Sequence, residues 1–268
     1  MVISHNLNAM NAHRRMKIST NDQGKAIEKL SSGYRINRAG DDAAGLAISE
    51  KMRAQISGLD QASRNAQDGI SMIQTTEGAL DETHSILNRL KTLAVQSANG
   101  TYSNGQRDLI QKEVKQLQAE IKRIGEKTDF NGTKVLKDNS SCILQVGDKK
   151  DDVITISMTA MTNPSGINAI VLSTQTQAQN AIETIDKAIT DVSAYRATLG
   201  AMQNRLEHTI KSVDNTSENI QAAESRIRDT DMAKEMMNYT KSQILTNAAQ
   251  SMLAQANQAP QGVLQLLQ

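Results

Sequence analysis

Few side chains in this 268-residue chain could bind a metal ion or act as a nucleophile. The four histidines are His5, His13, His84 and His208, and Cys142 is the only cysteine. No histidine lies in an H-E-x-x-H pattern and no cysteine cluster accompanies them, so the sequence predicts no zinc site and no intramolecular disulfide. Cys142 also lacks the nearby histidine or basic helix start that would mark a nucleophile. We therefore expect solvated histidines and a structural cysteine.

Three glycines, Gly33, Gly40 and Gly45, could suggest a phosphate-binding loop. They form neither G-x-G-x-x-G nor a G-K-[ST] pattern, so a bend between two helical segments explains them better. Positive and negative charges balance, with 30 Lys and Arg against 29 Asp and Glu. That balance provides no electrostatic reason to bind nucleic acid or an anionic membrane. The sequence thus predicts a protein that is not an enzyme, with no cofactor, metal, nucleic-acid or membrane partner.

The main pattern in the chain is an apolar residue at every seventh position. One row contains Ile185, Val192, Leu199, Leu206, Val213, Ile220 and Ile227. An apolar repeat of seven over this length predicts one continuous helix, at 178–227, that supercoils with others. At 1.5 Å per residue, the stretch 182–227 would be roughly 70 Å long.

A second row of the same period predicts a partner helix at 45–98. Its residues are Met52, Leu59, Ala66, Ile73, Leu80, Leu87 and Ala94. Two long helices of equal period favour an antiparallel pair, and we expect Leu206 and Val213 to face Leu59 and Ala66. A third helix at 105–127, which follows two Asn-Gly steps, should fold back on the end of the second.

Composition favours thin helical seams over a thick globular core. The chain has no Trp, one Phe and four Tyr, although aromatic residues usually fill the core of a globular enzyme. Its two prolines permit long helices almost everywhere. Between the helices, at 128–177, Asn131-Gly132 marks a turn, and Ile154, Ile156 and Met158 alternate with polar residues. This alternation predicts short β-hairpins.

The two ends of the chain are amphipathic but weakly apolar, so each would fold poorly alone. We expect residues 1–40 and 228–268 to pair as terminal helices and 41–227 to form a rod. The apolar residues that should meet neighbouring molecules are Ile3, Leu7, Met10, Ile27, Leu30, Leu245, Met252, Leu253, Val263, Leu264 and Leu267. The predicted fold is mainly α, a long antiparallel helical rod with a small β-hairpin region at one end and paired terminal helices at the other.

Two features of the termini bear on partners and export. The methionines at 232, 236, 237 and 252 fit either a promiscuous binding face or core packing, and the sequence alone leaves both open. The first ten residues, MVISHNLNAM, lack the basic and apolar regions of a signal peptide. We therefore expect no Sec-type export and no membrane span.

Five segments resemble the motifs of one protein family. They are LSSGYRINRAGDDAAGLAIS at 30–49, LAVQSAN at 93–99, DFNGT at 129–133, AESRIRDTDMAKEM at 223–236 and ANQAPQGVLQLL at 256–267. Their sequences and order are similar to those of bacterial flagellins along the whole chain. Tyr34 and Arg38 depart from the family pattern, which more often has leucine and a small residue. The short 158–178 segment implies a minimal form without outer variable domains.

The resemblance implies a structural subunit that polymerises into the flagellar filament for motility and is secreted by the type III apparatus to the extracellular flagellum. It implies further copies of the chain, an export chaperone at the C-terminal segment, and filament cap and junction proteins as partners. The terminal helices would form the innermost domain and the rod the next shell. A hook–filament junction protein is the alternative, but the close match at 30–49 favours the filament subunit.

The resemblance also implies recognition by Toll-like receptor 5 through Arg89, Leu93 and Glu113. Arg89 follows Leu87 by two residues, roughly 200° around the helix, so it should face outward. Leu93 lies one turn further along, and the third helix should bring Glu113 beside Arg89. We expect one exposed patch across two helices, in which an arginine and a leucine could anchor an interface. Thr92, where the family often has glutamate, predicts a weaker interaction.

Overall fold

The computed structural model describes residues 6–266, and the side chains of residues 6–258. Its helices are α1 (Leu7–Ser32), α2 (Ala43–Ala98), α3 (Asn104–Lys127), α4 (Gln175–Arg228), α5 (Met232–Leu266) and the short 3₁₀ helix η1 (Pro164–Ala169). Its strands are β1 (Asp129–Phe130), β2 (Thr133–Lys134), β3 (Ser140–Gln145) and β4 (Val153–Met158). The predicted class, mainly α with long helices and small β-hairpins, is confirmed.

The chain divides into two compact units. Unit 1 combines Met1–Ile56 with Glu218–Gln268, and unit 2 is Ser57–Ser217. This division falls inside α2 and α4, whereas we expected it near residues 40 and 228. Within unit 1, the segment between α1 and α2 bonds to the end of α4. The Arg35 amide donates to the Arg228 carbonyl, and the Thr230 amide to the Gly33 carbonyl.

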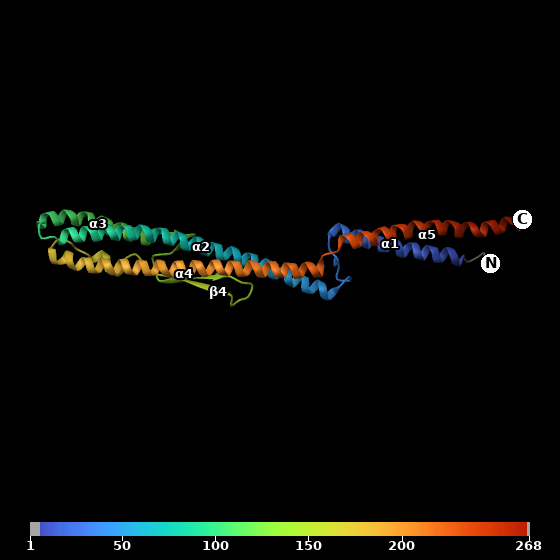
Figure 1. Ribbon diagram of the computed structural model, residues 1–268, viewed down its shortest axis with the longest axis horizontal. Helices are drawn as coiled ribbons and strands as arrows, with labels where there is room; N and C mark the ends of the chain where they lie inside the picture. Colours follow the sequence, from blue (N-terminus) through green and yellow to red (C-terminus); the bar gives the residue numbers. More distant parts are fainter. Residues whose placement is uncertain (1–5, 267–268) are drawn as a thin grey trace. The chain divides into compact units, whose positions relative to one another are not determined.

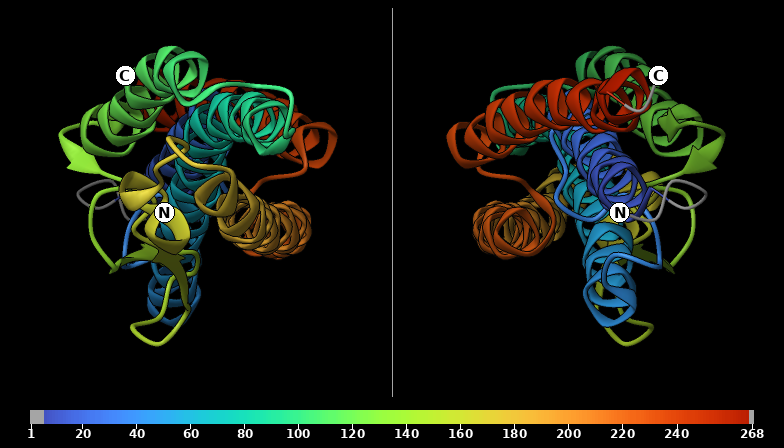
Figure 2. Two further views of the ribbon diagram at one scale, coloured as in Figure 1. Left: turned by 90° about the vertical axis from the view of Figure 1, so that its left-hand side faces the viewer. Right: turned by 90° about the vertical axis from the view of Figure 1, so that its right-hand side faces the viewer.

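In unit 2, α2 and α4 run antiparallel and α3 folds back beside α2 (Figure 1). End-on, η1 fills the side between α3 and α4 (Figure 2). Three hydrogen bonds account for its place there. Gln118 of α3 donates to the carbonyls of Ile167 and Ile170, at 2.8 and 3.0 Å. Ser165 of η1 hydrogen-bonds to Asp191 of α4.

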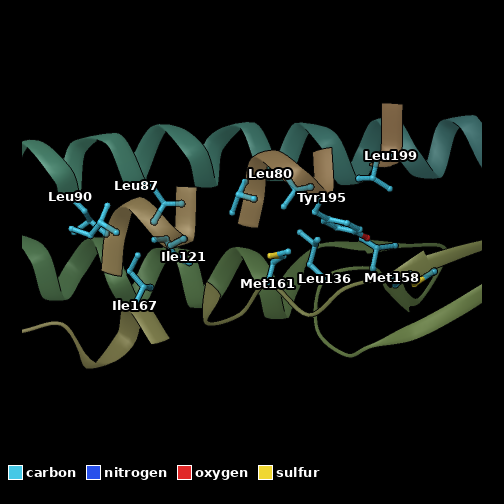
Figure 3. Close-up of a cluster of buried hydrophobic side chains, with 14 of the residues drawn as sticks. Leu80, Leu87, Leu90, Ile121, Leu136, Met158, Met161, Ile167, Tyr195 and Leu199 are labelled. Carbon is cyan, nitrogen blue, oxygen red and sulfur yellow. The ribbon is translucent and has the colours of Figure 1, made fainter. Parts of the chain in front are cut away.

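The core of unit 2 is a continuous apolar layer enclosed by these helices (Figure 3). Leu80 and Leu87 of α2 are completely buried, as is Leu136 after β2. Tyr195 of α4 is 7% exposed, and its hydroxyl oxygen accepts a hydrogen bond from the Thr159 amide at 3.3 Å. Burial raises the pKa of the Tyr195 phenol, because the charged form would lose its hydration, while the Thr159 amide opposes that shift.

The turn between α2 and α3 is built from polar side chains. Ser103 and Gln106 form a capping box that starts α3, in which each side chain bonds the other residue's backbone amide. Arg107 is only 5% exposed. Its guanidinium donates to the Ser97 carbonyl at 2.9 Å and to the Asn99 carbonyl at 3.0 Å. Arg107 therefore satisfies carbonyls that the end of α2 leaves without helical partners.

The β3–β4 hairpin lies beside α2, although we expected the hairpin region at one end of the rod. Its strands pair antiparallel from Ser140 opposite Met158 to Gln145 opposite Val153. Asn65 of α2 donates to the Gln145 carbonyl at 2.9 Å, and a side chain at Gly69 would clash with Leu144. Alternating burial along β4 explains this position, because its apolar face extends the core of unit 2.

In unit 1, α1 and α5 lie side by side (Figure 1). The Asn6 side chain caps α1 by accepting a hydrogen bond from the Ala9 amide at 3.1 Å, and its amide group donates to the Ala256 carbonyl at 2.6 Å. Gln23 hydrogen-bonds to Gln243 further along the pair. Gly33 ends α1 at a left-handed φ of 75°, a conformation that glycine adopts without a steric penalty.

Candidate assembly and recognition surfaces

Unit 1 buries almost none of its apolar side chains. Among the described residues, Ala26 and Ile36 are its only buried hydrophobic side chains, whereas unit 2 holds all the others. The large apolar residues of unit 1 that remain exposed are Leu7, Met10, Ile18, Ile27, Ile48, Met232, Met236, Met237, Ile244, Leu245 and Met252. An isolated chain would thus leave a large apolar surface in water, which marks an interaction surface.

Several residues that we expected in a terminal core belong to this surface. Leu7, Met10 and Met252 are more than 60% exposed, and Ile27 and Leu245 nearly half exposed. Leu30 and Leu253 are partly buried. Val263 and Leu264 lie in α5, in the part without described side chains, and Ile3 and Leu267 lie outside the described residues. Among the described side chains, the five exposed ones therefore do not form a dry core between α1 and α5.

Four of the exposed apolar residues on α5 form one stripe. Met236, Met237, Ile244 and Leu245 line a shallow depression, which Thr240 and Lys241 complete. Their spacing of one, seven and one residues places them on one side of the helix. Flexible methionine side chains suit contact with more than one partner surface.

Within unit 1, polar and cation–π contacts hold the segment after α1 against the end of α4. The Arg228 guanidinium lies 4.7 Å from the centre of the Tyr34 ring and bonds Glu50 at 2.7 Å. Tyr34 also forms a β-bridge with Asp229. The ring of Tyr34, one of the two departures from the family pattern, thus supplies a cation–π contact here.

The two seven-residue rows were expected to pack against each other as the seam of the rod. Their residues are buried to different degrees along the two helices. Leu59, Ile73, Leu80, Leu87, Leu199 and Leu206 are buried, whereas Met52, Val213 and Ile220 are only partly buried. Leu206 lies next to Gly69, which is one helical turn beyond the expected partner Ala66. Fewer side chains cover the two rows in the part of α2 and α4 that α3 does not reach.

Polar pairs that we did not predict join α2 and α4. Ser63 donates to Asp214 at 3.0 Å, and Ser217 donates to Asp60 at 3.1 Å. Both serines are 9% exposed. An ion pair between Lys91 and Asp186, at 2.6 Å, continues the same antiparallel register. A slip by seven residues would preserve the apolar rows but break these pairs, so they help to specify the register.

The proposed receptor patch is only partly as expected. The Arg89 guanidinium bonds Glu113 at 2.9 and 2.8 Å, and both side chains remain about half exposed. The prediction for Leu93 is wrong, because it is 2% exposed and belongs to the core of unit 2. Leu93 belongs to a further apolar row of α2, with Met72, Ala79 and Ile86, and lies in the core that also contains Val114 of α3. An exposed patch can contain Arg89 and Glu113 but not Leu93.

In the part of the chain with described side chains, residues suited to metal binding do not gather in one place. Within residues 6–258, no three His, Cys, Asp or Glu side chains are arranged to hold a metal ion. Cys142 is a partly buried residue of β3 opposite Ile156. Through the described part of the chain, no helix has the length and apolar character needed to cross a membrane.

Unit 2 has long helices around a thin core, and unit 1 is a helix pair that leaves most of its described apolar side chains exposed. These features are typical of a structural protein that associates with further protein chains. Residues 3–141 match the bacterial flagellin N-terminal helical region, and residues 182–267 match the bacterial flagellin C-terminal helical region. The chain therefore belongs to the bacterial flagellin family, and the resemblance found in the sequence is confirmed.

Full-length relatives support the same assignment. The chain is 59% identical to a flagellin of Halalkalibacterium halodurans and 47% identical to a flagellin of Bacillus subtilis. It is 49% identical to a flagellar filament 31.3 kDa core protein of Treponema maltophilum. All three alignments cover 100% of both chains.

Two solved structures share the fold. Bacillus cereus flagellin matches with a TM-score of 0.53 at 32% identity, covering 60% of this chain and 94% of that one. A putative flagellar hook-associated protein of Vibrio parahaemolyticus matches with a TM-score of 0.61 at 13% identity, covering 70% of this chain and all of that one. The fold therefore does not separate filament from hook-associated proteins, whereas the sequence identities favour the flagellins.

Proposed function

We propose that this chain is the structural subunit that polymerises into the bacterial flagellar filament, a secreted and extracellular assembly used for motility. The observation that carries the proposal is the exposed apolar surface of unit 1. Neighbouring copies would cover this surface, and the free energy of burying it would drive assembly. In this proposal residues 1–40 and 228–268 form the inner assembly domain, and 41–227 form the rod.

Polymerisation of the purified full-length chain tests this proposal. Ammonium sulfate strengthens burial of apolar surface, so it should convert dispersed subunits into long helical filaments visible by electron microscopy. Particles that stay dispersed under these conditions would contradict the filament role. They would favour the alternative, a hook–filament junction protein, which would not polymerise into long filaments.

Before assembly, the exposed apolar surface of unit 1 needs a different binding partner. We propose that an export chaperone binds the stripe of Met236, Met237, Ile244 and Leu245 on α5, and that type III export carries the subunit out of the cell. Flagellar cap and junction proteins would meet the subunit at the filament ends. Apolar exposure supports the chaperone site, because a soluble subunit would otherwise aggregate.

A second candidate function rests on the exposed ion pair of Arg89 and Glu113. We propose that the free subunit is recognised by Toll-like receptor 5 through these two side chains. An exposed ion pair contributes little to stability, so its removal should leave the fold intact.

We expect the double variant Arg89→Ala and Glu113→Ala to lose most of its ability to activate receptor-bearing cells. A desolvated arginine at the centre of an interface is often worth 2 kcal/mol or more, so the half-maximal dose should rise at least about tenfold. Circular dichroism should report an unchanged fold. The ion pair Lys187–Glu183, also exposed, provides the control, and its alanine variants should activate normally. An unchanged response from the Arg89 and Glu113 variant would contradict receptor binding at this patch.

A further inference from the structure

Unit 2 contains three steps at which glycine follows asparagine. They are Asn99-Gly100, Asn104-Gly105 and Asn131-Gly132. Glycine has no side chain to hinder its backbone nitrogen, which can therefore approach the carbonyl carbon of the preceding asparagine side chain. Attack at that carbon converts the asparagine without any enzyme, and asparagine is accordingly one of the thermolabile residues. Because the three steps are chemically alike, any difference between them must come from the fold.

The first two asparagines are held by Arg107. Its guanidinium donates to the Asn99 carbonyl at 3.0 Å and to the Asn104 side-chain oxygen at 2.9 Å. The Asn99 side-chain oxygen also accepts a hydrogen bond from the Thr101 amide at 3.3 Å. The rotations that would bring the next backbone nitrogen to either side chain must break these bonds. Asn104 also begins α3, where helical geometry restrains its backbone.

Asn131 lies in a different environment. It has a φ of 50° and Gly132 a φ of 82°, and both residues are exposed in the turn between β1 and β2. An added Cβ at Gly132 would meet no atom within 4 Å. Among the described residues, none forms a hydrogen bond with the Asn131 side chain. The hairpin has only two residue pairs, so little structure must open for the turn to change conformation.

We propose that Asn131 is a site of spontaneous deamidation in the folded chain and that Asn99 and Asn104 are protected. The backbone nitrogen of Gly132 attacks Cγ of Asn131, and a carbon–nitrogen bond forms. The bond to the side-chain amide nitrogen breaks, and ammonia leaves with the proton that the Gly132 nitrogen gives up. Water then opens the resulting succinimide at one carbonyl or the other, which produces aspartate or isoaspartate.

The modification would alter the main chain at the edge of the unit 2 core. Isoaspartate adds one methylene to the backbone of a tight turn, and either product adds a carboxylate near the ion pair of Asp129 and Lys134. Val135 and Leu136 follow this turn and are 1% and 0% exposed. Ageing of the protein would therefore begin next to buried side chains, although Asn131 itself is exposed.

Trypsin separates the proposed site from its internal controls. Cleavage after Lys127 and Lys134 releases TDFNGTK, which contains only Asn131. Cleavage after Lys91 and Arg107 releases TLAVQSANGTYSNGQR, which contains Asn99 and Asn104. The full-length folded chain is aged at mildly alkaline pH and digested, and mass spectrometry measures deamidation in both peptides. Asn131 should deamidate at least about tenfold faster than either control, because hydrogen bonds restrain only the controls.

Two further measurements connect this difference to the structure. In a chain aged in concentrated urea the three rates should converge. Arg107→Lys keeps the charge and the trypsin site but loses the guanidinium fork, so deamidation of Asn99 and Asn104 should accelerate while Asn131 is unchanged. Equal rates at the three sites in the folded wild-type chain, or faster deamidation of the longer peptide, would overturn the proposal whether or not the variant folds.

Discussion

Deleting residues 1–40 together with 230–268 should abolish polymerisation and leave a folded, soluble unit. Among the described side chains, this deletion removes only two buried hydrophobic residues, Ala26 and Ile36. Every core contact of unit 2 remains, whereas the exposed apolar residues of α1 and α5 are lost. The expected product is thus a helical protein without the surface that drives assembly.

Electron microscopy and circular dichroism together test the deletion. Under salt conditions that polymerise the full-length chain, the fragment should remain dispersed and keep a cooperative thermal transition. Filaments formed by the fragment would contradict the assembly role of the terminal helices. A fragment without a cooperative transition would instead show that unit 2 depends on α1 or α5 for its stability.

Replacing Leu206 with alanine should destabilise unit 2 by about 2–5 kcal/mol, as large-to-small substitutions in a core do. Leu206 is completely buried next to Gly69 of α2, a position that the hairpin residue Leu144 also approaches. Helix α4 is held in register by polar pairs, and the hairpin is bonded to α2. These restraints oppose collapse around the missing atoms, so a cavity should persist.

Urea unfolding of the free subunit measures this loss. The control is Leu109→Ala, the same chemical change on α3 at a side chain that is 63% exposed. That variant should change the free energy of unfolding by no more than about 0.5 kcal/mol. Equal losses for the two variants would mean that the seven-residue row of α4 does not face a packed core.

Local sequence patterns accounted for most of the secondary structure. The seven-residue rows located α2 and α4, because an apolar stripe on a long helix must be buried against another helix. Asn131-Gly132 located the β1–β2 turn, since both residues can adopt positive φ values. The low apolar content of the chain ends indicated that they need partners, and the exposed residues of α1 and α5 are compatible with that expectation.

Only the tertiary structure shows which apolar rows of each helix are buried and which neighbouring elements bury them. Leu93 occupies one of two apolar rows on α2, and the sequence did not reveal that α3 and its neighbours cover that row. Val213 has the same type and spacing as Leu206, yet it stays partly exposed where fewer elements surround the seam. The physical reason is that a seven-residue period specifies the face of a helix but neither its partner nor its register. Contacts between distant residues, such as Ser63 with Asp214, supply that information.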